Sequence, residues 1–258
     1  MKLIFTFIIL HLLSSCSVFQ KNEYDFDRKL YAIDDNQYID QIAHLKNVYV
    51  KTDGVREVRL SKKSKAYLEA IYYKLVSNNK LLLGSFYKPT FFIIKSDVPF
   101  YFSLPKGQFF FSSSLILKYI KNEEIFVAAF ASEVVKSQRN LYLKQIRIPT
   151  GYFPTDELIA YLRVPVKVKS EINKWTYHVI KRSGHDPYAY LIWLQTLNKN
   201  TLDFSLLYGN TQDISKEEHL FKNFISKIKT EEFIQSERKR NSSSGFYSFI
   251  REVKRRGM

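Results

Sequence analysis

The sequence contains a single cysteine, Cys16, among its 258 residues, which excludes any disulfide within the chain. It shows no internal repeat, no glycine-rich phosphate loop and no Ser-His-Asp or Cys-His grouping, so common signatures of nucleotide binding and nucleophilic catalysis are missing. Acidic residues are also few, because 25 Asp and Glu stand against 40 Lys and Arg and give a formal charge of +15. Such a charge favours anionic partners, such as phospholipid or lipopolysaccharide head groups or acidic envelope polymers.

The longest apolar run lies at the start of the chain, and it is too short to span a bilayer. It covers residues 3–13, follows Lys2 and ends at Leu13-Ser14-Ser15-Cys16, which is similar to a bacterial lipobox. We therefore predict a lipoprotein signal peptide at 1–15 and a lipid anchor on Cys16; an ordinary secretory cleavage site is the alternative. Ser17 after the cysteine favours the outer membrane, facing the periplasm. Removing residues 1–15 takes away only Lys2, so 39 basic and 25 acidic residues leave a formal charge of +14.

Hydrophobic periodicity and turn residues predict a mainly helical domain with a small sheet. Apolar residues at three- and four-residue steps indicate helices, whereas short aromatic runs bounded by Pro and Gly indicate strands. Strands are expected at 91–95, 100–103 and 108–112, and a buried helix at 124–138 follows them. Further helices are expected at 61–78, 156–162, 169–183, 188–197 and 215–229, with a weaker one at 37–50. The predicted fold class is α+β, with a small antiparallel sheet beside the helix at 124–138.

The domain boundaries follow from changes in composition along the chain. A polar tether is predicted at 16–36, a folded domain at 37–230 and a basic C-terminal extension at 231–258. Within that extension, residues 246–258 place Phe246, Phe249 and Val253 on one helical face and basic residues elsewhere. Such a helix could lie on an anionic membrane surface or dock on the folded domain as a terminal helix.

One stretch of the chain carries a family resemblance. Two expected strands enclose Leu104-Pro105-Lys106-Gly107, and the helix after them contains Ser132-Glu133-Val134-Val135-Lys136. Further on, Gly184-His185-Asp186-Pro187 follows a second helix, and Glu171 lies thirteen residues before that glycine. In order and spacing this pattern resembles the zinc metallopeptidases of the HtpX, BepA and Oma type (metallopeptidase family 48). Those enzymes carry His-Glu-x-x-His and Gly-Tyr-Asp-Pro at the matching places, and the resemblance covers about residues 90–225.

The resemblance implies a gluzincin-like fold with Glu133 at the position of the catalytic base. It places Ser132, Lys136 and Gln212 where the family has histidines, and Glu171 where the family has its third zinc ligand. A hydroxyl is a poor zinc ligand and an ammonium repels a metal ion, so we expect no cofactor and no peptidase activity. The five histidines of the chain offer no spacing that would rebuild the site. We expect the Lys136 ammonium to replace the metal, within about 4 Å of Glu133 or Glu171.

The function implied by these expectations is that of a non-catalytic scaffold or chaperone of the cell envelope. Protein or peptide partners would bind in a groove near Phe100–Ser103, an edge strand that pairs with substrate backbone in the family. Two alternatives stay open. The chain could be an active zinc metalloendopeptidase with non-standard ligands, or a structural tether to an anionic envelope polymer. Nucleic acid is not an expected partner, because the N-terminus carries an export signal.

Overall fold

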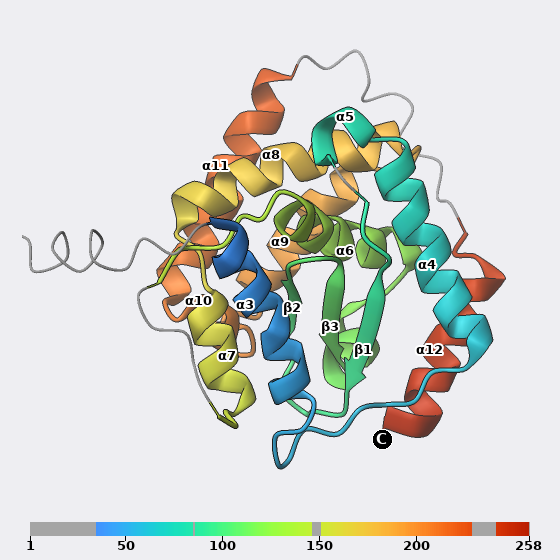
Figure 1. Ribbon diagram of the computed structural model, residues 1–258. Coiled ribbons are helices and arrows are strands. Elements are labelled where there is room, and N and C mark those ends of the chain that lie inside the picture. The colour runs from blue at the N-terminus through green and yellow to red at the C-terminus, as the bar shows by residue number, and fades with distance from the viewer. Residues whose placement is uncertain (1–34, 85, 146–150, 229–240, 258) are drawn as a thin grey trace, which may run out of the picture.

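The computed structural model describes residues 35–84, 86–145, 151–228 and 241–257. Cys16, the expected signal peptide and most of the expected tether lie outside these residues. The described chain is a mixed α and β structure, mostly helical, with one small sheet (Figure 1). Its helices are α3 (Asp35–Tyr49), α4 (Lys62–Ser77), α5 (Lys80–Leu83), η2 (Leu115–Tyr119), α6 (Glu123–Gln138), α7 (Thr155–Leu162), α8 (Val166–Arg182), α9 (Tyr188–Lys199), α10 (Ser205–Tyr208), α11 (Thr211–Lys227) and α12 (Ser244–Gly257). None of the described helices has the length and apolar character needed to cross a bilayer.

The sheet has three strands in the order β1 (Thr90–Ile94), β3 (Gln108–Ser112), β2 (Tyr101–Leu104). β2 and β3 are antiparallel, as predicted, but β1 and β3 are parallel, with Phe91 opposite Phe109. The predicted antiparallel sheet is therefore wrong in one of its two pairings. The reason is that β3 lies between β1 and β2, with β2 at the edge of the sheet. The residue pattern within each strand does not specify this order.

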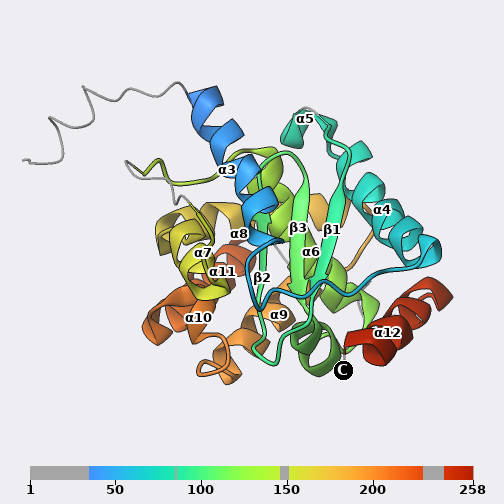
Figure 2. The same cartoon turned by 60° about the horizontal axis from the view of Figure 1, so that its bottom comes forward.

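The two faces of the sheet are covered by different helices (Figures 1 and 2). Because neighbouring side chains of a strand point to opposite faces, each strand contributes to both sides. Phe100, Phe102 and Phe110 pack in a cluster with side chains of α3 and α7. Phe109 and Phe111 join the larger core, to which α4, α6, α8, α9, α11 and α12 contribute. The sheet is thus buried on both sides, which accounts for its aromatic composition.

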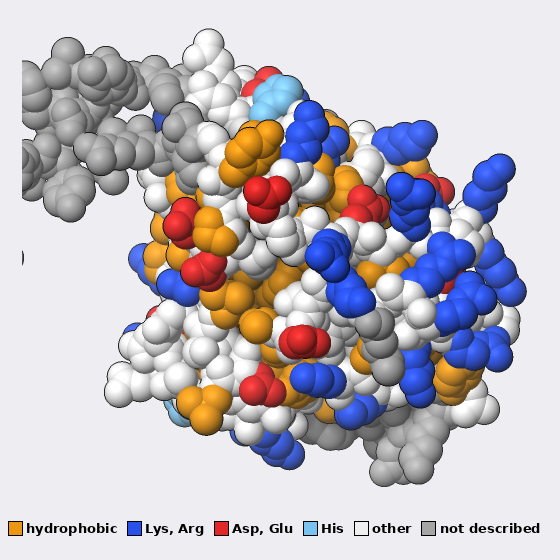
Figure 3. Space-filling model, turned by 90° about the horizontal axis from the view of Figure 1, so that it is seen from below, with side chains coloured by type: hydrophobic (Ala, Val, Ile, Leu, Met, Phe, Trp, Pro, Cys, Tyr) orange, Lys and Arg blue, Asp and Glu red, His pale blue; other side chains and the backbone are white. Residues whose placement is uncertain are grey.

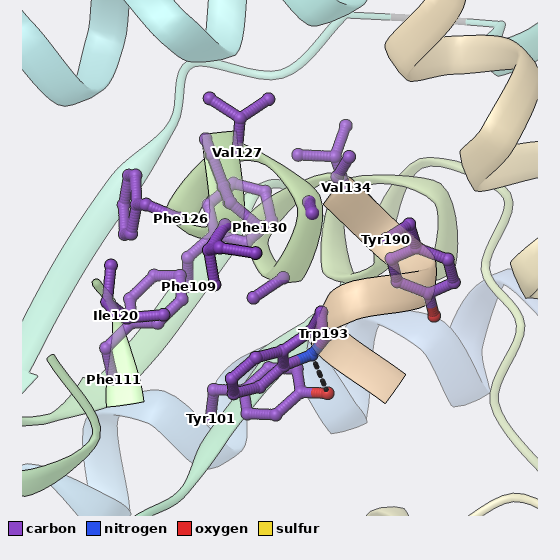
Figure 4. Packing of buried hydrophobic residues seen from close by; sticks show 14 of the residues in the cluster. Tyr101, Phe109, Phe111, Ile120, Phe126, Val127, Phe130, Val134, Tyr190 and Trp193 are labelled. Carbon is purple, nitrogen blue, oxygen red and sulfur yellow. Dashed lines mark hydrogen bonds between the residues drawn. The ribbon is translucent and has the colours of Figure 1, made fainter. Parts of the chain in front are cut away.

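Helix α6 crosses behind the sheet and is buried nearly all round. Asn122 caps its N-terminus by accepting a hydrogen bond from the amide of Ile125, and acidic residues in its first turn complement the helix dipole. Figure 4 shows Phe126 and Phe130 of α6 among the phenylalanines of β3. On the same side, the Trp193 indole N–H of α9 donates to the Tyr101 hydroxyl of β2 at 3.0 Å. These contacts join α6 to β3 and α9 to β2.

The segment predicted as a C-terminal extension is, over Ser244–Gly257, a helix docked on the folded body. Phe246, Phe249 and Val253 of α12 are buried in the main core, and Phe249 packs on Tyr67 of α4. The apolar face of α12 is therefore used in packing rather than left free for a membrane.

A buried carboxylate ties α12 to α4. Glu252 is 7% exposed and accepts hydrogen bonds from the amide and hydroxyl of Ser61 and from the hydroxyl of Ser64. Ser61 is also the N-cap of α4, so one carboxylate fixes the start of α4 and the position of α12. Burial raises the pKa of Glu252, but hydrogen bonds from Ser64 and Ser61 outweigh it and hold the pKa below its usual value.

Replacing Glu252 with glutamine is expected to lower the free energy of unfolding by about 1–3 kcal/mol at neutral pH, because charge-assisted hydrogen bonds are lost. Since the folded-state pKa is lowered, the carboxylate stabilises the fold above its unfolded pKa, and this contribution disappears as the pH falls through the folded pKa. Urea denaturation should therefore show the difference between the two proteins shrinking in acid. The exposed Glu171, which pairs with Lys174, provides the control, and Glu171→Gln should cost less than about 0.5 kcal/mol. Equal losses in the two variants would contradict the role of Glu252.

Candidate functional site

A small polar pocket lies between the outer edge of β2 and helices α6, α7, α8 and α11. Its volume is about 70 Å³, enough for a few non-hydrogen atoms. Most of its polar lining comes from charged and tyrosine side chains. The lining residues are Tyr101, Phe102, Ser132, Glu133, Lys136, Ile159, Leu162, Arg163, Val164, Lys169, Ile172, Asn173, Tyr190, Leu207, Tyr208 and Glu217.

The predicted residues of α6 all reach this pocket. At about 100° per residue, Ser132, Glu133 and Lys136 lie within an arc of about 100° on the same helix, so their side chains face one region. The Ser103 hydroxyl of β2 donates to the Glu133 carboxylate at 2.7 Å, which links the helix to the strand edge. The Ser132 hydroxyl donates instead to the carbonyl of Ala129 at 2.8 Å, a common contact within a helix.

Lys136 is buried, but its partners differ from the expected ones. Its ammonium donates to the carbonyl of Leu162 at 3.2 Å and lies 5.3 Å from the ring centre of Tyr142. Burial lowers the pKa of Lys136, and the nearby charge of Glu133 only partly offsets this. Among the described residues Lys136 forms no ion pair within 4 Å of either Glu133 or Glu171. The predicted salt bridge is therefore wrong.

Glu171 and Gln212, the other two predicted positions, do not join the site. Glu171 is exposed and pairs with Lys174 at 2.7 Å. Gln212 is exposed in the first turn of α11, where its backbone N–H donates to the side-chain oxygen of the capping residue Asn210. Each residue of an α-helix is turned by about 100° from the last, so a residue two positions from the pocket-facing Asn173 lies on the opposite face of α8.

The pocket instead receives five polar residues, from α8, α9, α10 and α11, that sequence reasoning did not select as binding residues. The Asn173 amide donates to Glu217 Oε1 at 2.9 Å, and the Tyr190 hydroxyl donates to Asn173 Oδ1 at 2.6 Å. The Lys169 ammonium lies 3.8 Å from Glu217 Oε2 and 3.2 Å from the ring centre of Tyr208. Glu217 had a detectable signal, because it falls on the buried stripe of α11 that includes Ile214 and Phe221. Lys169 had none, since a lysine in an amphipathic helix normally faces water.

Burial dominates the electrostatics of the pocket. It lowers the pKa of Lys169 to about 8, with Glu217 opposing the shift and the positive charge of Lys136 reinforcing it. Burial and the charge of Glu133 raise the pKa of Tyr101 well above its ordinary value. Burial and the charge of Glu217 do the same to Tyr190 and Tyr208. The tyrosines therefore stay protonated hydrogen-bond donors, whereas Lys136 and Lys169 lose their protons more readily than a solvated lysine does.

The donor set of this pocket does not fit zinc. Zinc is held by neutral imidazoles, thiolates or carboxylates, whereas Ser132 and Lys136 offer the pocket a hydroxyl and an ammonium. The carboxylates of Glu133 and Glu217 already accept hydrogen bonds from Ser103 and Asn173. Within the described ranges, no three His, Cys, Asp or Glu side chains come together as ligands for a metal ion.

The pocket lies against a strand edge with unused main-chain groups. Tyr101 and Phe102 both line it, although their side chains belong to opposite faces of the sheet, and only a cavity at the edge can meet both. Phe102 pairs with Phe110, and the Ser112 amide donates to the Phe100 carbonyl, so alternate residues of β2 bond to β3. The amides and carbonyls of Tyr101 and Ser103 therefore point away from β3, and no described residue supplies a hydrogen bond to them. Both residues are nevertheless buried, at 8% and 0% exposed, and the Tyr142 hydroxyl lies 3.2 Å from the Ser103 hydroxyl.

Comparison with protein-family models and with the curated proteins finds no match to this chain.

Proposed function

We propose that this chain binds extended polypeptide segments as a scaffold or chaperone, on a gluzincin-like fold related to metallopeptidase family 48 but without peptidase activity. The observation that carries the proposal is the outer edge of β2, whose free main-chain groups at Tyr101 and Ser103 lie beside the pocket of α6. An extended chain added to this edge would supply the missing hydrogen bonds, and because Tyr101 and Ser103 are buried it would first displace covering side chains such as Tyr142. Glu133, held by Ser103, then stays a structural remnant of a catalytic base.

The same proposal anchors the protein in the bacterial envelope through a lipid on Cys16, at the outer membrane facing the periplasm. Its support is the short apolar run before Leu13-Ser14-Ser15-Cys16. The predicted tether would then give the binding domain freedom to meet partners near the membrane.

Replacing Ser103 with proline tests the strand edge. Proline removes an amide that points away from β3, so the sheet should survive while the donor to a bound peptide is lost. We expect at least about tenfold weaker binding of a fluorescent heptapeptide of alternating Val and Thr, measured by anisotropy, since one hydrogen bond and one steric contact change. Ser103→Ala is the matched control, because it removes the hydroxyl bonded to Glu133 but keeps the amide. Unchanged binding by a folded Ser103→Pro variant would count against the proposal.

The rival function, a zinc peptidase with non-standard ligands, makes the opposite prediction for metal and activity. Protein purified without chelators should contain far less zinc than one ion per chain, measured by elemental analysis, and should not cleave casein. Stoichiometric zinc together with casein cleavage abolished by Glu133→Gln would establish the rival.

A second role is favoured by the basic face of α4 and α12. Figure 3 shows Lys and Arg side chains gathered on the side of the molecule where these helices lie. The exposed basic residues of these helices include Lys62, Lys63 and Lys65 of α4 and Arg251, Lys254, Arg255 and Arg256 of α12. Because the apolar side of α12 is buried, this face can offer charge but not an inserted hydrophobic surface. We infer that it rests on anionic lipid head groups, which would orient a lipid-anchored protein.

Replacing Arg251, Lys254 and Arg255 together with glutamate is expected to weaken binding to vesicles that contain phosphatidylglycerol. Each basic residue near an anionic surface contributes about 1 kcal/mol, so the loss should exceed about a hundredfold at low salt, as measured by co-sedimentation. Binding by the wild type should also fall as salt is raised. A variant with Lys167 and Lys174 of α8 changed to glutamate is the control. If the control loses as much affinity as the triple variant, net charge rather than this face is responsible.

A further inference from the structure

The pocket beside α6 holds buried polar groups that the described chain leaves only partly satisfied. Glu217 is 3% exposed, and its Oε2 atom accepts no hydrogen bond from a described residue. The closest cation, Lys169, lies 3.8 Å away, an ion-pair distance that is too long for a hydrogen bond. Lys136 is 7% exposed and, in the described chain, donates to the Leu162 carbonyl alone, although an ammonium carries three N–H donors. The pocket therefore contains unused N–H donors on Lys136 and an unused acceptor on Glu217.

The charges of the lining are also unbalanced. Three cations, Lys136, Arg163 and Lys169, face two carboxylates, Glu133 and Glu217, so the fully ionised pocket carries one net positive charge. Buried charge without a partner is costly, and a singly charged anion would balance it. Because Oε2 of Glu217 lacks a hydrogen-bond donor, the ligand that fits best also carries an N–H group close to its negative charge.

We propose that this pocket binds the carboxylate of an N-acylated amino acid, which is the chemistry of a polypeptide C-terminus. The carboxylate accepts hydrogen bonds from the ammonium groups of Lys136 and Lys169. The amide N–H of the same residue donates to Oε2 of Glu217. The pocket volume of about 70 Å³ restricts the last residue to a small side chain such as alanine.

The inference rests on the proposed function, because a chain lying along β2 would deliver its end to this pocket. Tyr101 and Phe102 belong both to the outer edge of β2 and to the pocket lining, so the edge and the pocket are continuous. A bound carboxylate would also oppose the effect of burial, which lowers the pKa of both Lys136 and Lys169. The protein would then recognise chain ends rather than internal segments.

The test compares two labelled heptapeptides of alternating Val and Thr that end in alanine, one with a free carboxylate and one with a C-terminal amide. The wild type should bind the free acid at least about tenfold more tightly, because a charge-assisted hydrogen bond is lost with the amide. Lys136→Met and Lys169→Met should each reduce this preference to less than about threefold. Lys167→Met, an exposed lysine on the same helix as Lys169, is the matched control and should keep it. N-Acetylalanine is tested separately, by competition and by its effect on thermal unfolding, to represent a free small carboxylate.

Each outcome separates the inference from the function on which it rests. Equal affinity of the wild type for acid and amide would overturn the carboxylate site and leave peptide binding at β2 intact. Stabilisation by N-acetylalanine without binding of either peptide would support the carboxylate site and overturn peptide binding. No effect of any of the three compounds would overturn both. The acid-to-amide comparison in the wild type decides the matter even where a lysine variant does not fold.

Discussion

Replacing Phe130 with alanine is expected to lower the free energy of unfolding by about 3–5 kcal/mol, the usual cost of truncating a fully buried phenylalanine. Phe130 is completely buried in the middle of α6, and its ring meets those of Phe91, Phe109 and Phe111 on the sheet. The cavity would lie between the helix and both pairings of the sheet, where the surrounding rings cannot collapse without moving the strands. Chemical denaturation followed by circular dichroism measures the loss.

Phe86→Ala is the control for this prediction, because Phe86 is 47% exposed and has little packing to lose. We expect it to cost less than about 1 kcal/mol. A loss below about 1.5 kcal/mol for Phe130→Ala would mean that α6 does not pack on the sheet as described.

Lys169 is expected to make the stability of the wild type rise by roughly 2 kcal/mol between pH 8 and pH 10, and Lys169→Met should remove that part of the rise. The pKa of Lys169 is about 8 in the folded protein and 10.5 in the unfolded chain. Between these values the unfolded chain binds one more proton than the folded protein, so raising the pH favours folding. Lys136, whose pKa is also lowered, acts in the same direction, whereas Glu217, Glu133 and Asp213 favour the protonated lysine.

The rise should end near pH 10, where the tyrosines begin to act. The pKa values of Tyr101, Tyr190 and Tyr208 are raised by burial, so the unfolded chain loses these protons first and stability falls at higher pH. Urea denaturation at half-unit pH intervals measures the profile, with Lys174→Met as a control on the exposed side of the same helix. A flat wild-type profile between pH 8 and pH 10 would show that Lys169 is solvated in the folded state.

The candidate site was only half predictable from the sequence. The family resemblance pointed to Ser132, Glu133 and Lys136, and they reach the pocket together because they share one helix, where spacing fixes their relative positions. Glu171 and Gln212 were also named from the resemblance, on other helices, and both lie outside the pocket. Lys169 and Glu217 took their places, although Glu217 could have been noticed as a charge on the buried stripe of α11.

The amino-acid sequence by itself determined the type and approximate bounds of the longer elements, including the three aromatic strands and the buried helix α6, but not the short helices α5, η2 and α10. These depend on periodicity and turn residues within short stretches of chain. Only the tertiary structure decided that β3 lies between β1 and β2, that α12 docks on α4, and that Asn173 rather than Glu171 faces the pocket. Such choices depend on contacts between distant segments of the chain. Because each residue of a helix is rotated by about 100° from the last, a residue two positions away from a buried one lies on the opposite face.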